Sequence, residues 1–216
     1  MTMLHKSIVF ACAVSAMASA ALAGPNAGGV ILLHVDDALV YTDDHGSYCS
    51  DFGLVECGDA SARTDQTEPT VVFALAAFPH ESTPQVLGLT FGIAFDPNDL
   101  EVVDFGHCAD REGNTTPNWP GPGEGTALSW DEAQTDRLLK FYWFAVYWTA
   151  RHPSSLRLQP HPTQDGMFLG PGPTDPLDPI ADYGELGFGT DGYLPCPDGP
   201  VPTQQATWGG LKNHFR

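Results

Sequence analysis

Nine consecutive residues, 87–95, alternate without a break between large apolar and small side chains, in the order LGLTFGIAF. A period of two is typical of a β-strand with a heavy face in the core and a light face outside it. The turn-forming sequence Asp96-Pro97-Asn98-Asp99 follows. The next strand then begins with Leu100, Val102, Val103 and Phe105. We therefore predict a hairpin-like pair of strands over 87–105 and a sheet-based core.

Other apolar stretches predict the remaining strands: 30–41 with a bend at Asp36-Asp37, 71–78, 126–130, short edge strands near Leu156 and Phe168, and 183–189. The aromatic and β-branched density of residues 141–149 (FYWFAVYWT) favours a buried strand. A helix is the alternative there, because Ser129 and Glu132 upstream have capping-box spacing. Short strands separated by turns indicate an all-β, antiparallel two-sheet β-sandwich with long loops.

The N-terminal residues predict export. Lys6 precedes an apolar and small-residue stretch over 8–22, and Ala21-Leu22-Ala23 is a small-x-small cleavage site directly before Gly24. The alternative, a membrane anchor, is disfavoured because the stretch is short for a spanning helix. We expect a signal peptide at 1–23, a single sandwich domain at 24–196, and a proline-rich connector with a tail at 197–216.

The tail combines a basic charge with regularly spaced apolar side chains. Their spacing of three and four residues would place them on one face of a short C-terminal helix. Such a helix is marginal alone, so we expect it to dock on this domain or on a surface-attachment component. The residues concerned are Trp208, Leu211, Lys212 and Phe215.

Four cysteines remain after signal removal: Cys49, Cys57, Cys108 and Cys196. An even number in an exported chain predicts two disulfides. We expect Cys49 to pair with Cys57 and Cys108 with Cys196, so that the polar stretch 42–70 forms a stapled excursion at one end of the domain. A zinc site is the alternative, but the sequence has no C-x-x-C spacing.

The chain is strongly acidic, with a formal net charge of −18. This charge disfavours nucleic acid and anionic membrane surfaces as partners. Two groups of aspartates are candidate calcium ligands, although neither has EF-hand spacing and turn-forming surface aspartates are the competing interpretation. The first group is Asp36, Asp37, Asp43 and Asp44, and the second is Asp175, Asp178 and Asp182.

The sequence lacks the common catalytic motifs G-x-S-x-G and H-E-x-x-H, and it also lacks the phosphate-binding motif G-x-x-x-x-G-K. We therefore predict no catalytic residue. The scattered histidines, such as His107, His152 and His161, do not predict a transition-metal site. Trp119 and Trp130, in or beside a polar loop, are candidates for a ligand platform, with core packing as the alternative.

Residues 87–103, LGLTFGIAFDPNDLEVV, resemble the strand–turn–strand signature of cohesin-like β-sandwiches, in which an alternating strand ends in a Tyr/Phe-Asp-Pro turn before a Leu-x-Val strand. The resemblance implies a carbohydrate-binding-type jelly roll. The cysteine-bearing excursion departs from the cohesin pattern, so no binding residue is transferred. A second resemblance, to a group of secreted bacterial proteins without an assigned activity, rests on Tyr142-Trp-Phe-Ala, Gly187-Phe-Gly, Gly192-Tyr-Leu-Pro-Cys and the Thr-Trp-Gly-x-x-Lys ending.

These observations predict a secreted, non-catalytic binding or assembly module of the cell surface or extracellular matrix. Its expected partner is a protein or a polysaccharide, with no nucleic acid, no membrane span after signal removal, and calcium as the one cofactor considered. One alternative is a secreted carbohydrate-active hydrolase, whose carboxylate pair has no fixed spacing in sequence. The other is an extracellular filament subunit, in which residues 24–40 add a strand to a neighbouring copy.

Overall fold

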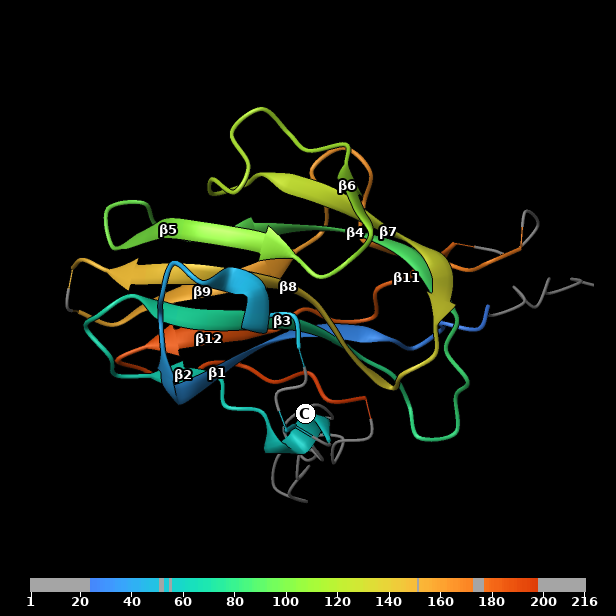
Figure 1. The fold of residues 1–216 in the computed structure, drawn as a ribbon, viewed down its shortest axis with the longest axis horizontal. Coiled ribbons are helices and arrows are strands. Elements are labelled where there is room, and N and C mark those ends of the chain that lie inside the picture. The colour runs from blue at the N-terminus through green and yellow to red at the C-terminus, as the bar shows by residue number, and fades with distance from the viewer. Residues whose placement is uncertain (1–23, 51–52, 55, 151, 173–176, 198–216) are drawn as a thin grey trace, which may run out of the picture.

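Two β-sheets form in the part of the chain that the computed structural model describes, residues 24–50, 53–54, 56–150, 152–172 and 177–197 (Figure 1). The first is a four-stranded antiparallel sheet in the order β1-β3-β8-β5. Its strands are β1 (Val30–Val40), β3 (Thr70–Ala77), β8 (Leu138–Trp148) and β5 (Leu100–His107).

The second sheet contains eight strands, with the path β11-β10-β4-β9-β12-β2 and with β7 and β6 added beside β4. All of its pairings are antiparallel except that of β2 with β12. Its strands are β2 (Arg63–Thr64), β4 (Val86–Ala94), β6 (Arg111–Gly113), β7 (Gly125–Gln134), β9 (Ser154–Gln159), β10 (Met167–Leu169), β11 (Asp178–Pro179) and β12 (Glu185–Phe188). The predicted all-β two-sheet sandwich is confirmed. The predicted C-terminal helix lies outside the described residues.

The alternating stretch forms β4, and its heavy side chains Leu89, Phe91 and Ile93 are buried in the core between the sheets. Its light face is required by close backbone contacts. A Cβ atom on Gly88 would lie 2.8 Å from the carbonyl oxygen of Leu128, and one on Gly92 would lie 2.6 Å from that of Glu124. The period of two therefore results from tight packing on both faces of the strand, with large side chains on one face and close backbone contacts on the other.

The predicted hairpin over 87–105 is wrong in its pairing. β4 pairs with β7, β9 and β10, whereas β5 pairs with β8 in the other sheet. The Asp96–Asp99 turn, in which Asp96 Oδ1 accepts the N–H of Asn98 at 2.9 Å, carries the chain from one sheet to the other. Alternation shows that a strand buries one face, but it does not show which strand lies beside it.

The aromatic stretch forms strand β8 and not a helix, and it is buried on both faces. Tyr142, Phe144 and Val146 point into the core, while Trp143 and Ala145 belong to a second apolar cluster on the outer face of the four-stranded sheet. The described residues of the segment 42–62, which we call the cap, cover that outer face (Figure 1). Tyr48 and Ala60 of the cap belong to the same apolar cluster, and Leu54 and Cys57 pack against it.

The cap crosses the outer face of the four-stranded sheet and returns. It contains two short 3₁₀ turns, His45–Ser47 and Cys57–Asp59, and Tyr48 packs on Trp143 with ring centroids 4.8 Å apart. It ends beside β1, where Val35 and Ser61 form a backbone hydrogen bond of 3.0 Å. The excursion therefore covers a sheet face, which corrects its predicted place at one end of the domain. No helix in the described residues is long and apolar enough to cross a membrane.

Candidate functional site

Two disulfides attach the cap to the body of the sandwich. Cys49 is bonded to Cys108, just beyond the end of β5, and Cys57 is bonded to Cys196 near the C-terminal end of the domain. All four cysteines are thus in disulfides, as expected, but the predicted pairing of Cys49 with Cys57 and of Cys108 with Cys196 is wrong. The cap is not closed on itself, and it is held at two points by distant parts of the chain.

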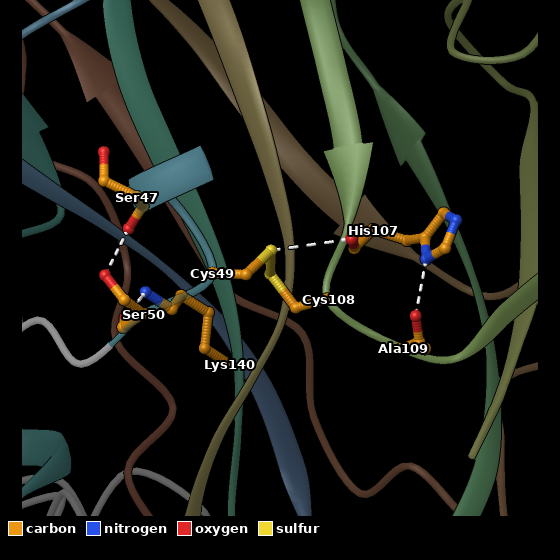
Figure 2. Close-up of a disulfide and its surroundings, with 7 residues drawn as sticks. All are labelled: Ser47, Cys49, Ser50, His107, Cys108, Ala109 and Lys140. Atoms are coloured by element: carbon orange, nitrogen blue, oxygen red, sulfur yellow. Dashed lines mark hydrogen bonds between the residues drawn. A yellow bond between two sulfur atoms is a disulfide. The ribbon is translucent and has the colours of Figure 1, made fainter. Parts of the chain in front are cut away.

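Figure 2 shows the first of these attachments. The Cys49 sulfur lies 3.5 Å from the carbonyl oxygen of His107, and the His107 ring is within hydrogen-bond distance of the carbonyl of Ala109, at 2.8 Å. The Lys140 ammonium group from β8 donates to the carbonyl oxygen of Ser50. The cap is therefore fixed against both β5 and β8 at this corner.

A cluster of polar aromatic side chains lies where the cap passes over β5. Asp104 is at its centre: its Oδ2 atom accepts the Tyr41 hydroxyl at 2.8 Å and lies 2.7 Å from Nε2 of His45. The hydrogen bond to this carboxylate raises the pKa of Tyr41 to about 12. The His45 ring lies 5.0 Å from the Trp143 ring. These contacts hold the cap and β5 in one fixed arrangement.

Strand β5 is the last strand of the four-stranded sheet, and no described strand pairs with its outer edge. The N–H of Phe105 faces away from β8 and donates to Oδ1 of the adjacent Asp104 at 2.8 Å. Two apolar side chains on this strand are exposed, Val103 by 43% and Phe105 by 39%. This combination of an unpaired edge and exposed apolar side chains is what strand-adding partners recognise.

Sequence reasoning did not identify this edge. The available signal was the adjacent pair Val102-Val103, which breaks the alternation of β5. In the structure the β5–β8 register shifts between Val102 and Asp104, so Val103 occupies a bulge.

Ser, Asp and His side chains meet beside the start of β9. Ser154 donates to Asp99 Oδ2 at 3.2 Å, and His152 Nε2 lies 3.2 Å from Asp99 Oδ1. The carboxylate stands between the hydroxyl and the imidazole. This order lacks the direct contact through which a histidine base activates a serine.

The candidate calcium ligands are engaged elsewhere. Asp178 is buried and accepts two backbone N–H groups, and Asp182 accepts the Tyr193 hydroxyl at 2.6 Å. Asp37 binds Thr64, while Asp36 and Asp44 accept nearby backbone N–H groups. No group of three or more candidate metal ligands occurs among the described residues, which include Asp43 but not Asp175.

The two candidate platform tryptophans lie against the core. Trp130 is only 6% exposed, and Trp119 is partly buried with its Nε1–H donating to the Tyr142 hydroxyl at 2.9 Å. That hydroxyl donates in turn to Glu112 at 2.9 Å, and burial raises the pKa of Tyr142. The tail residues Trp208, Leu211, Lys212 and Phe215, like the signal peptide at 1–23, lie outside the described residues.

No protein-family model and no curated protein sequence matches the chain. In structure the chain is similar to cohesin modules, as residues 87–103 led us to expect. A cohesin module from a Clostridium perfringens family 33 glycoside hydrolase has a TM-score of 0.46 at 7% identity, covering 74% of this chain and 94% of that one. The Coh-OlpC–Doc435 cohesin–dockerin complex of Clostridium thermocellum gives 0.45 at 9% identity, covering 74% and 93%. The seventh ScaB type I cohesin from Pseudobacteroides cellulosolvens gives 0.42 at 13% identity, covering 59% and 87%.

Proposed function

We propose that this chain is an exported, non-catalytic module that binds another protein by accepting an extended segment along β5. The observation that carries the proposal is the unpaired outer edge of β5, which presents Val103 and Phe105 to solvent. An added strand would form backbone hydrogen bonds with this edge, and its alternate side chains would cover the two apolar groups.

The surroundings of β5 are suited to such a role because they are already ordered. The Cys49–Cys108 disulfide holds the end of the strand, and the contacts of Asp104 with Tyr41 and His45 hold its middle. Binding to a rigid edge requires little additional ordering on this side of the interface, which favours affinity. The two disulfides also agree with an oxidising extracellular or cell-surface location.

The charge beside the edge indicates the chemistry of the partner. Glu101 and Asp104 flank the exposed apolar side chains, and the whole chain carries a net charge of −18. A partner segment that alternates apolar and basic residues would match both features. Its backbone carbonyl would replace Asp104 Oδ1 on the N–H of Phe105. The same carboxylates oppose pairing of β5 with a second copy of itself.

Strand donation by residues 24–40 has less support. Val30–Val40 forms β1 of its own sheet, where it pairs with β3, and Ile31, Leu33 and Val35 are buried in the core. Donating this segment to a neighbour would expose these side chains. The edge of β5 can accept a strand without any such loss.

The test compares two surface variants of the mature, oxidised protein used as bait for extracellular and envelope proteins of the producing cells. The double variant Val103→Lys/Phe105→Lys places two long charged side chains on the edge, which opposes strand addition. Leu169→Lys is the matched control, because Leu169 is exposed by 40% on β10 of the other sheet.

We expect wild type and Leu169→Lys to retain the same partner. The double variant should bind it at least about tenfold more weakly, the equivalent of about 1.4 kcal/mol. Equal binding by the double variant, with all three proteins folded, would refute docking at β5. Loss of binding in the Leu169→Lys control alone would place the interface on the other sheet.

A further inference from the structure

The described chain begins at Gly24, and its backbone nitrogen is bound to a buried carboxylate. Gly24 N lies 2.8 Å from Oδ1 of Asp178, and Asn26 N lies 2.9 Å from Oδ2 of the same side chain. Asp178 belongs to β11 and is only 3% exposed. Asp178 therefore binds the backbone at the start of the domain, although it lies more than 150 residues further along the chain.

The fit around Gly24 is close. A Cβ atom on this residue would lie 2.4 Å from Asp178 Oδ2, so no larger residue fits without displacing the carboxylate. Two residues later, the fully buried Asn26 exchanges hydrogen bonds with the backbone of Gln85, at 2.8 and 3.1 Å. Asp178 thus holds Gly24, and Gln85 holds Asn26 two residues later.

The surroundings of Asp178 are short of positive charge in the part of the chain that the structure describes. Among the described residues, no lysine, arginine or histidine forms an ion pair with Asp178. A buried carboxylate is costly unless a positive charge or several donors compensate for it. The described residues supply two N–H donors to Asp178 and no cationic side chain.

We propose that hydrolysis of the Ala23–Gly24 peptide bond supplies this charge, and that the new α-ammonium group of Gly24 forms an ion pair with the buried carboxylate of Asp178. A signal peptidase would add water across the bond, so that Ala23 leaves with a carboxylate and Gly24 keeps the amine. The amine takes up a proton at neutral pH, since a free α-amino group has a pKa of about 8. The proposal rests on export of the chain, and it is independent of any partner at β5.

The consequence is a domain that becomes more stable when it is processed. In the precursor, Gly24 offers Asp178 one neutral amide N–H. In the mature chain it offers a charged donor, which makes stronger hydrogen bonds in a buried setting. Cleavage at another position would leave Asp178 without this charged partner. The domain should therefore be most stable when the mature chain starts at Gly24.

The first test is a stability cycle on proteins with both disulfides oxidised. One form starts at Gly24 and the other at Ala21, which keeps the Gly24 N–H but moves the charge away by three residues. Each is made with Asp178 and with Asp178→Asn, and Asp182→Asn is the matched control for loss of an aspartate from the same segment.

We expect the extension to raise the unfolding equilibrium constant at least about tenfold in the Asp178 background and in the Asp182→Asn control. The effect should be under about twofold in Asp178→Asn, because the charge no longer has its partner. An extension effect of equal size in the Asp178 and Asp178→Asn backgrounds would overturn the ion pair.

A second measurement uses only the wild-type protein, so its outcome does not depend on whether a variant folds. The wild-type protein starting at Gly24 is treated with an amine-acetylating reagent near neutral pH, and acetylation of the N-terminal peptide is followed by mass spectrometry. A half-buried ammonium group paired with Asp178 should react at least about tenfold more slowly in the folded protein than in urea. Equal rates would contradict the proposal, and so would a secreted protein whose first residue is not Gly24.

Discussion

Single side chains decide how the cap is attached to the sheet. His34, on β1, is 8% exposed, and its Nδ1 atom accepts the N–H of Ser61 at 3.0 Å. This bond requires an unprotonated Nδ1. Burial lowers the pKa of His34 from its ordinary value of 6.5, and the nearby Asp36 carboxylate opposes this effect only in part. Nothing in the sequence around His34 distinguishes it from the other seven histidines, because its role depends on Ser61, 27 residues away.

The lowered pKa predicts a loss of stability in mild acid. Because the folded state holds the proton less tightly than the unfolded state, stability should fall as the pH falls from about 6.5 through the pKa of folded His34. In His34→Asn, the amide oxygen can accept the same N–H but does not titrate. We expect urea unfolding between pH 7.5 and 5 to show a smaller loss for His34→Asn than for wild type, and a loss close to that of wild type for the exposed His152→Asn. An identical loss in wild type and His34→Asn would exclude this role.

At the scale of elements, the sequence predicts which residues form strands but not which strands pair. The apolar stretches at 30–41, 71–78 and 141–149 all form strands, because burial of a strand requires a run of apolar residues that is visible in the sequence. The partner of β4 and the cysteine pairing leave no such record. The short loop between Cys49 and Cys57 favours their pairing in the sequence. In the structure the cap crosses the sheet, so these two cysteines are separated and each is bonded to a cysteine that is distant in the chain.

The observed pairing predicts that each disulfide contributes strongly to stability. The bonds close loops of 59 and 139 residues. In the chain-entropy model such loops correspond to about 4 and about 5 kcal/mol, as upper values. We expect Cys49→Ser/Cys108→Ser and Cys57→Ser/Cys196→Ser each to lower the free energy of unfolding by about 2–5 kcal/mol, measured with urea.

Removal of the Cys49–Cys108 bond should also loosen the cap over Trp143 and shift tryptophan fluorescence to longer wavelength. In a proteolytic digest of the unreduced protein, the peptide that contains Cys49 should be linked to the one that contains Cys108. The peptide that contains Cys57 should likewise be linked to the one that contains Cys196. Recovery of a Cys49–Cys57 pair in their place would contradict the placement of the cap.

At the scale of the whole molecule, the cap determines which surfaces remain open. It covers the outer face of the four-stranded sheet, whereas the edge of this sheet at β5, the proposed binding site, has no described strand beside it. The composition and the alternation of 87–95 were sufficient to predict a sandwich. The open edge could not be predicted, because exposure of Val103 and Phe105 depends on which strand ends the sheet. The contact of Asp178 with Gly24 could not be predicted for the same reason, since the two residues are adjacent only in the folded chain.

Hydrogen exchange of the mature protein with and without its bound partner tests docking at β5 most directly. An added strand would protect the outward-facing amides of Leu100–His107, which in the free protein have no strand on that side. We predict slower exchange in residues 100–107 and the adjoining part of the cap, and unchanged exchange in Met167–Leu169 of the other sheet. Partner binding that leaves the exchange of residues 100–107 unchanged would contradict the proposed function.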